Sequence, residues 1–290
     1  MENIYFADLL FEVLTPIKSL PEYHGARFSA YLRFACRKVN ASFNECCIAL
    51  LPFRKGKNII LEGQHVKLRM ILTEEGINRL SNICSALAVT SGKGDFSSES
   101  LRLCAIYDGV SGKEIDYRED PENSFTPFTA HSVEDEINAL LCYHYFTLNF
   151  ISPLRLLLPA GKKLKTAAKV DKLCKEDFFA CDDASLMHVI SSVRDLGELD
   201  VENFSGYSFP VPWSCETEWT EFKYSRDRQI HLDGVTGTVT FKGKLNSEYL
   251  AQRLVMGQYL GIGQDRRFGN GFYFIPELNP ARQINYFLST

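Results

Sequence analysis

One stretch near the C-terminal end constrains this chain more than any other: Gly261-Ile262-Gly263-Gln264-Asp265-Arg266-Arg267-Phe268-Gly269-Asn270-Gly271. Its four glycines follow the pattern G-x-G-x5-G-x-G. Glycine permits positive φ and lets another backbone approach closely. Such a loop presents N–H groups to an anion, its two arginines can add bidentate phosphate contacts, and Phe268 offers a flat face to a base. The stretch therefore predicts polyanion binding, with a plain turn between two elements as the alternative.

The elements around this stretch form a recurring pattern. Ser247 can cap a helix that runs to Met256, and a strand is expected over Gly271–Ile275. Asp233-Gly234 predicts a two-residue hairpin turn between strands over Glu218–Leu232 and Val235–Phe241. Further upstream we expect a helix over Ala184–Leu196 and a strand over Leu140–Ile151.

The first half repeats the order. Strands are predicted over Ile4–Leu14, Val66–Leu72 and Leu101–Tyr107, and a helix over Glu74–Val89 with Thr73 as its N-cap. A helix after Pro21 carries one apolar face, made of Phe28, Tyr31, Leu32, Ala35, Cys36 and Val39. The acidic segment Lys113–Thr129 is the candidate linker. We therefore predict an α+β chain of two tandem ferredoxin-like (RRM-like, βαββαβ) domains, at residues 1–130 and 131–290.

Composition limits the class of protein. The chain has 290 residues, 45% of them hydrophobic, and a formal net charge of -4, so an RNA or DNA site must be a local patch. Six lysines lie between Lys162 and Lys175, where a solvated helix face is the alternative to a binding site. The nine cysteines form no C-x-x-C pair. With no basic leader and no run of 18 apolar residues in the sequence, we expect a cytoplasmic protein and no membrane partner.

At four places the sequence resembles the CRISPR-associated endoribonucleases of the RAMP (repeat-associated mysterious protein) superfamily, which process precursor CRISPR RNA (pre-crRNA). The places are Gly261–Gly271, Phe150-Ile151-Ser152-Pro153-Leu154-Arg155-Leu156, Tyr224–Gln229 with Gly234 and Gly237, and Leu20-Pro21-Glu22-Tyr23-His24-Gly25. The resemblance implies two ferredoxin-like domains and metal-independent cleavage of the CRISPR repeat RNA without a cofactor. It also implies retention of the cut RNA in an interference complex, with other subunits of that complex as partners.

Metal-free RNA cleavage uses the ribose 2′-OH as nucleophile and needs a general acid and a general base, for which histidine is suited near neutral pH. His24 stands where the family often has a catalytic histidine, at the start of the first helix. Its alternative is a polar surface histidine. Tyr31 and Lys38 on that helix are possible helpers, although packing and solvation are their simpler roles. His65 shares a strand face with Lys67 and Arg69, and His144 is expected in the core or at an interface.

The candidate RNA-binding residues are the cations and glycines of the matched segments: Arg27, Arg155, Arg226, Arg228, Gly261, Gly263, Arg266, Arg267, Phe268, Gly269 and Gly271. No H-E-x-x-H and no helical histidine pair occurs in the sequence, so no metal site is expected. Two rival hypotheses stay open. One is a non-catalytic RAMP subunit that binds CRISPR RNA (crRNA) without cutting it. The other is an unrelated α+β enzyme for a small phosphorylated metabolite, although neither a P-loop nor G-x-G-x-x-G is present.

Overall fold

A computed structural model of the chain describes residues 3–18, 24–52, 59–90, 96–118, 123–154, 210–220, 232, 234–263 and 265–278. These residues fall into two compact units. The first unit takes in the chain as far as Ser132 together with Arg267–Gly269. The second takes in Val133–Arg266 and, among the described residues, the chain from Asn270 to Leu278.

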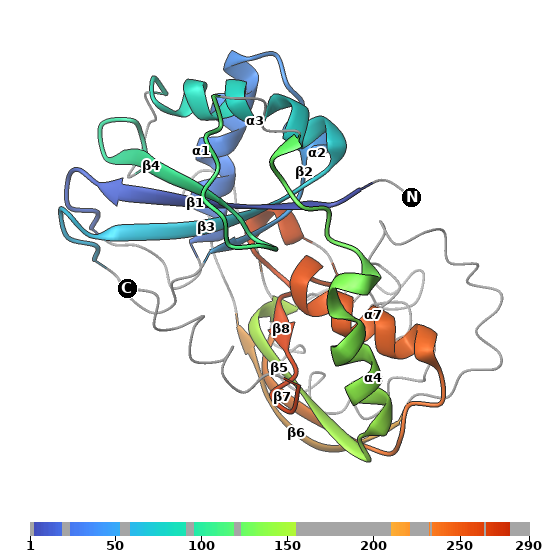
Figure 1. Cartoon of the computed structure of the whole chain (residues 1–290). Helices are drawn as coiled ribbons and strands as arrows, with labels where there is room; N and C mark the ends of the chain where they lie inside the picture. The colour runs from blue at the N-terminus through green and yellow to red at the C-terminus, as the bar shows by residue number, and fades with distance from the viewer. Residues whose placement is uncertain are drawn as a thin grey trace. The chain divides into compact units, whose positions relative to one another are not determined.

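The first unit is a four-stranded antiparallel sheet in the order β2-β3-β1-β4. Helices α1 and α3 cover one face of it (Figure 1). Its elements are β1 (Tyr5–Val13), α1 (Gly25–Lys38), α2 (Phe43–Cys46), β2 (Cys47–Pro52), β3 (His65–Leu72), α3 (Glu74–Leu87) and β4 (Leu101–Asp108). With α1 between β1 and β2 and α3 between β3 and β4, this is the ferredoxin-like βαββαβ plan.

Most predicted elements of this unit are confirmed. The apolar face of α1 is buried from Phe28 to Cys36, and the Thr73 side chain accepts a hydrogen bond from the Gly76 N–H at 3.1 Å, as an N-cap should. Strand β2 was not anticipated, because Cys47–Pro52 is short and its apolar residues do not alternate with polar ones.

The predicted linker, Lys113–Thr129, packs on the first unit at several points. Ile115 and Phe125 belong to its hydrophobic core, and the Phe128 ring lies 4.5 Å from that of Phe6. The Thr126 N–H donates to the Asp108 carboxylate at 3.3 Å. Aromatic burial therefore outweighs the acidic, proline-containing character that suggested a linker.

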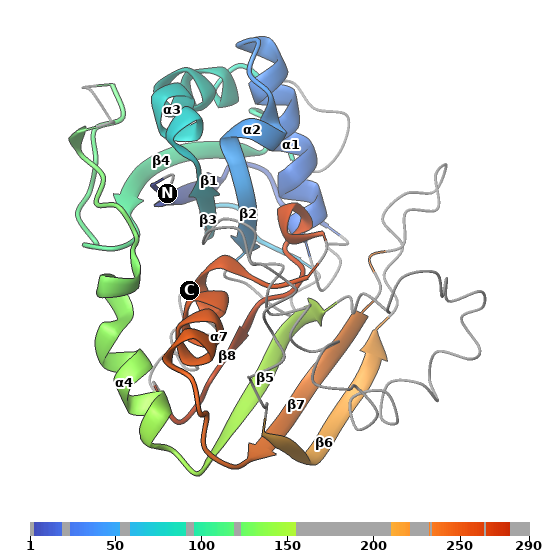
Figure 2. The ribbon, with the colours of Figure 1, turned by 90° about the vertical axis from the view of Figure 1, so that its right-hand side faces the viewer.

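The second unit repeats the plan with a sheet in the order β6-β7-β5-β8, covered on one face by helices α4 and α7 (Figure 2). Its elements are α4 (Glu134–Cys142), β5 (Tyr145–Leu154), β6 (Val211–Thr220), β7 (Gly234–Lys242), α7 (Glu248–Leu260) and β8 (Tyr273–Phe274). Two 3-10 turns, η2 (Ala130–Val133) and η4 (Arg266–Phe268), contain residues of both units. Ser247 caps α7 as predicted, through the Leu250 N–H at 3.4 Å. The predicted helix Ala184–Leu196 lies outside the described residues.

Two predictions in this unit are wrong. The strand expected from Leu140 begins at Tyr145, because Glu134–Cys142 is helical; the Tyr259 hydroxyl donates to Glu136 on that helix at 2.6 Å. The two-residue turn at Asp233-Gly234 is also wrong, because Gly234 is paired with Thr220 inside the ladder, with residues 221–233 between them. A Cβ on Gly234 would lie 2.7 Å from the Leu154 carbonyl oxygen, so this glycine allows a close backbone approach.

Candidate nucleic-acid interface

His24 is placed by the start of helix α1. Its carbonyl accepts hydrogen bonds from the N–H groups of Arg27, at 3.0 Å, and Phe28, at 3.3 Å, so it occupies the N-cap position. Its ring lies 6.0 Å from the Phe28 ring, and the residue is only 2% exposed. His24 is therefore a buried residue of the first unit, unlike the surface histidine of the alternative interpretation.

The next residue, Gly25, meets the glycine-rich loop. A Cβ built on Gly25 would lie 2.1 Å from the Phe268 carbonyl oxygen and 3.1 Å from the Gly269 Cα. Both of these residues belong to the first unit, as does Arg267. We call Arg267–Gly269 the docked turn. Only glycine, which has no Cβ, lets this turn approach the start of α1 so closely.

Arg267 anchors the docked turn to the first unit. Its Nε donates to the Cys47 carbonyl at 2.5 Å, and a terminal nitrogen donates to the Asn44 carbonyl at 2.7 Å. The guanidinium of Arg33 lies 5.6 Å from the ring centroid of Phe268 and 4.7 Å from that of Phe43. Burial, and then the charge of Arg267, lower the pKa of Arg33. Two cations are thus gathered at this place.

The ends of the glycine-rich loop are tied to β5 in the second unit. The Gly271 N–H donates to the Pro153 carbonyl at 2.9 Å, and the Phe272 N–H donates to the Ser152 hydroxyl at 2.8 Å. A Cβ on Gly271, where φ is +79°, would lie 1.8 Å from the Ile262 carbonyl oxygen. Two of the segments on which the resemblance rests, Ser152-Pro153 and the glycine-rich loop, are therefore in direct contact.

The packing of the glycine-rich loop engages backbone N–H groups that we expected to bind an anion. The N–H groups of Gly261, Ile262 and Gly271 all donate to backbone carbonyls of the second unit, those of Gly257, Gly271 and Pro153 respectively. Several of the glycines thus serve tight packing of the loop. The side chains of Arg266, Arg267 and Phe268 are partly exposed.

Tyr31 and Lys38 meet the C-terminal end of α3. The Tyr31 hydroxyl donates to the Leu87 carbonyl at 2.9 Å, and the Lys38 amine donates to the Val89 carbonyl. Burial raises the pKa of Tyr31 to about 12. At 1.5 Å per residue, they stand about 10 Å and about 20 Å along α1 from His24. The structure therefore does not bring these two side chains to His24.

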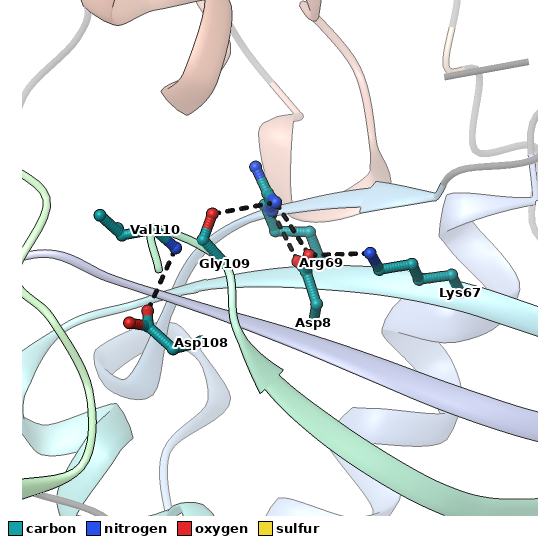
Figure 3. A network of polar contacts seen from close by, with 6 residues as sticks. All are labelled: Asp8, Lys67, Arg69, Asp108, Gly109 and Val110. Carbon is teal, nitrogen blue, oxygen red and sulfur yellow. Dashed lines mark hydrogen bonds and ion pairs between the residues drawn. The ribbon is translucent and has the colours of Figure 1, made fainter. Parts of the chain in front are cut away.

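The strand face of His65, Lys67 and Arg69 exists as predicted, but its charge is partly neutralised. Asp8 on β1 lies 3.2 Å from the Lys67 amine and receives two hydrogen bonds from Arg69, at 2.6 and 2.8 Å (Figure 3). Arg69 also approaches the Gly109 carbonyl at 3.4 Å. Asp8 could not be foreseen from alternation within β3, because it comes from the neighbouring strand.

Several predicted residues lie outside the described part of the chain: Arg155, Arg226, Arg228, the cluster Lys162–Lys175 and the segment Leu20–Tyr23. Within the described part, His, Cys, Asp and Glu side chains form no group of three or more that could hold a metal ion. No helix in that part is both long and apolar enough to cross a membrane. The residues that sequence reasoning missed are Arg33 and the carbonyls of Asn44 and Cys47.

No protein-family model matches the sequence, and no curated protein matches it. Solved structures do. A chain of a partial Cas6-RT-Cas1–Cas2 complex is 14% identical with a TM-score of 0.65, over 95% of this chain and 46% of that one. A chain of a Cas6-RT-Cas1–Cas2 complex matches with the same identity, TM-score and coverage of this chain, over 29% of its own length. The present chain thus spans less than half of either relative, and the likeness confirms the predicted fold of two ferredoxin-like domains.

Proposed function

We propose that this chain binds CRISPR precursor RNA and cleaves it within its repeats to give mature crRNA, as a metal-independent endoribonuclease. The observation that carries the proposal is the docking of the glycine-rich loop beside His24: Phe268 and Gly269 fill the space that Gly25 leaves open at the start of α1. The fold shared with chains of Cas6-containing complexes supports the choice of RNA as substrate.

The reaction needs three kinds of protein group: a general base, a general acid and a cation that stabilises negative charge. The ribose 2′-OH attacks the adjacent phosphorus while its proton passes to a base, and the leaving 5′-oxygen takes a proton from an acid. The products are a 2′,3′-cyclic phosphate and a 5′-OH, so no water is consumed. His24 fills one of the proton-transfer roles, worth typically about 10²–10⁴ in rate. Cations such as Arg33 stabilise the charge that develops on the phosphorane.

We propose that different parts of the chain carry catalysis and RNA binding. We assign the catalytic region to residues 1–130 and the RNA-binding loop to residues 131–290, with Arg27, Arg266 and Phe268 as contacts among the described residues. Arg155, Arg226 and Arg228 complete the proposed set. Phosphate contacts fix the position of the RNA, and unstacked bases supply sequence preference. Other subunits of a CRISPR complex are the proposed protein partners.

The test is cleavage of the cognate repeat RNA by the purified chain in EDTA. We expect one cut with a 2′,3′-cyclic phosphate end. His24→Ala should abolish the cut and leave RNA affinity within a few fold, while the exposed His131→Ala serves as the matched control. Cleavage that requires added magnesium contradicts the mechanism, and undiminished cutting by His24→Ala removes the role from this residue.

A second function has one observation in its favour. His24 is 2% exposed, and a buried imidazole must be uncovered before it can reach RNA. A non-catalytic RAMP subunit that holds crRNA would need no such exposure. Tight binding of the repeat RNA with no cut under any of these conditions selects this alternative.

A further inference from the structure

One end of the second sheet carries a row of exposed side chains from three neighbouring strands. Trp213 on β6 is 66% exposed and Tyr145 on β5 is 60% exposed. Lys242 on β7 lies between them: it is the cross-strand partner of Tyr145, and its amine is 4.2 Å from the Trp213 ring centroid. We call these three residues the end patch.

The core of the unit does not require aromatic residues at these positions. Phe146 and Phe241 face the helices and stack on each other at 5.2 Å, so by alternation their neighbours Tyr145 and Lys242 face the other way. The register of β6 against β7 shifts between Pro212 and Ser214, which places Trp213 at the irregularity. The core of the unit therefore does not account for the two exposed rings.

The surroundings of the end patch hold two lysines, Lys242 and Lys244, together with the carboxylate of Glu277, which accepts a hydrogen bond from the Thr147 N–H at 3.1 Å. Three segments meet here, residues 142–147, 210–214 and 241–247, and they contain Lys242 and Lys244 but no aspartate or glutamate. His144, which we expected in the core or at an interface, is exposed, and its carbonyl accepts from the Gly243 N–H at 2.8 Å. Rings interleaved with cations are the surface chemistry of single-strand binding.

We propose that the end patch binds single-stranded RNA, with one base on Trp213, another on Tyr145 and the phosphate between them at Lys242. At about 4.8 Å between strands, β5 and β6 hold the two rings about 10 Å apart with the amine between them. In the next row of the same face, the hydroxyls of Thr147 and Thr240 lie 3.1 Å apart and can bond a ribose or a base edge. Stacking accepts any base, so the site has little sequence preference.

The end patch is separate from the glycine-rich loop. Tyr145 begins β5 and Ser152 lies near its end, so the two places are about 23 Å apart along the strand. The inference rests on the proposed function only for the choice of RNA as ligand. The end patch would be a second binding site for the same RNA strand, and none of its residues is a proposed cleavage residue.

The experiment uses the two tryptophans of the chain. In the full-length variant Trp219→Phe, Trp213 is the one remaining indole, and its fluorescence is titrated with an octamer of uridine at low ionic strength. We expect quenching that saturates. Tyr145→Ala or Lys242→Ala in this background should weaken the affinity about tenfold. The matched control is Phe34→Ala, which removes another exposed ring beside a cation, since Phe34 is 47% exposed and lies 5.7 Å from the Arg37 guanidinium.

Each outcome decides the matter. No quenching, or an affinity unchanged by both Tyr145→Ala and Lys242→Ala, overturns the end patch as an RNA site. Quenching by an added CRISPR-complex subunit but not by the octamer would assign the patch to a protein partner and overturn it equally. The octamer carries no repeat, so failure here together with intact repeat cleavage leaves the proposed function standing. Saturating quenching by the octamer together with no cleavage of the repeat RNA would support the end patch and contradict the proposed nuclease function.

Discussion

At the residue scale, Gly25→Ala adds one methyl group at the contact between the start of α1 and the docked turn. We expect Gly25→Ala to displace the Phe268 carbonyl, which a Cβ would approach to 2.1 Å, and so to shift the docked turn from the start of α1. A displacement of about 1 Å beside reacting groups can cost about 100-fold in rate. The measurement is the single-turnover rate of repeat cleavage, taken below the melting temperature of the variant.

Gly76→Ala is the control for this substitution. Gly76 lies in the first turn of α3, and its Cβ would meet the Cys46 carbonyl oxygen at the same 2.1 Å; neither glycine has a positive φ. Both variants should lose about 1–3 kcal/mol of stability through overpacking. Only Gly25→Ala should also lower the rate of repeat cleavage. Equal rates in the two variants would show that the docked turn does not position His24.

At the scale of elements, Tyr31 tests how α1 holds α3. Tyr31→Phe removes the hydroxyl that donates to Leu87, so we expect a loss of about 1 kcal/mol in the free energy of unfolding and cleavage close to that of the unmodified chain. The folded pKa of about 12 is above the ordinary 10.0, so the hydroxyl's contribution is complete below about pH 10 and is lost as the pH rises towards 12. Denaturant titrations should therefore show the difference in the free energy of unfolding at pH 7, and that difference should shrink as the pH rises from about 10 towards 12. A large loss of cleavage with unchanged stability would instead make Tyr31 catalytic.

The elements that could be predicted are those with a long and strict pattern. The apolar face of α1 and the Thr73 cap of α3 are both readable from residue spacing alone. Gly234 misled the prediction because an Asp-Gly pair is typical of hairpin turns, whereas here the glycine makes room for the Leu154 backbone. No local pattern distinguishes these two uses of glycine.

The site was less predictable than the fold. Arg267 bonds the carbonyls of Asn44 and Cys47, which are 223 and 220 residues away in sequence. Backbone carbonyls carry no sequence signal, and Cys47 begins the strand that was not anticipated. Spacing therefore identified the loop as a candidate site and predicted that its arginines contact RNA, but it could not show that Arg267 bonds backbone carbonyls of the first unit.

At the scale of the whole molecule, a net charge of -4 means that the proposed RNA affinity must come from a local patch of cations. Arg266 and Arg267 differ in this respect although they are neighbours. Both are partly exposed, but Arg267 has two donors engaged on backbone carbonyls of the first unit. We therefore expect Arg266→Ala to remove one phosphate contact, which makes the slope of log affinity against log salt shallower by about 0.7 for a single strand.

Arg267→Ala should do the opposite. Losing two hydrogen bonds from a charged group should cost about 1–3 kcal/mol in the free energy of unfolding, because the carbonyls of Asn44 and Cys47 lose their partner and the Cys47 bond is partly buried. Its salt slope should stay that of the unmodified chain, while affinity falls through the loosened docked turn. The two variants are compared by repeat-RNA titrations across a salt series and by thermal unfolding. If Arg267→Ala flattens the slope as much as Arg266→Ala and melts normally, both arginines contact phosphate and the docked turn is held by other contacts.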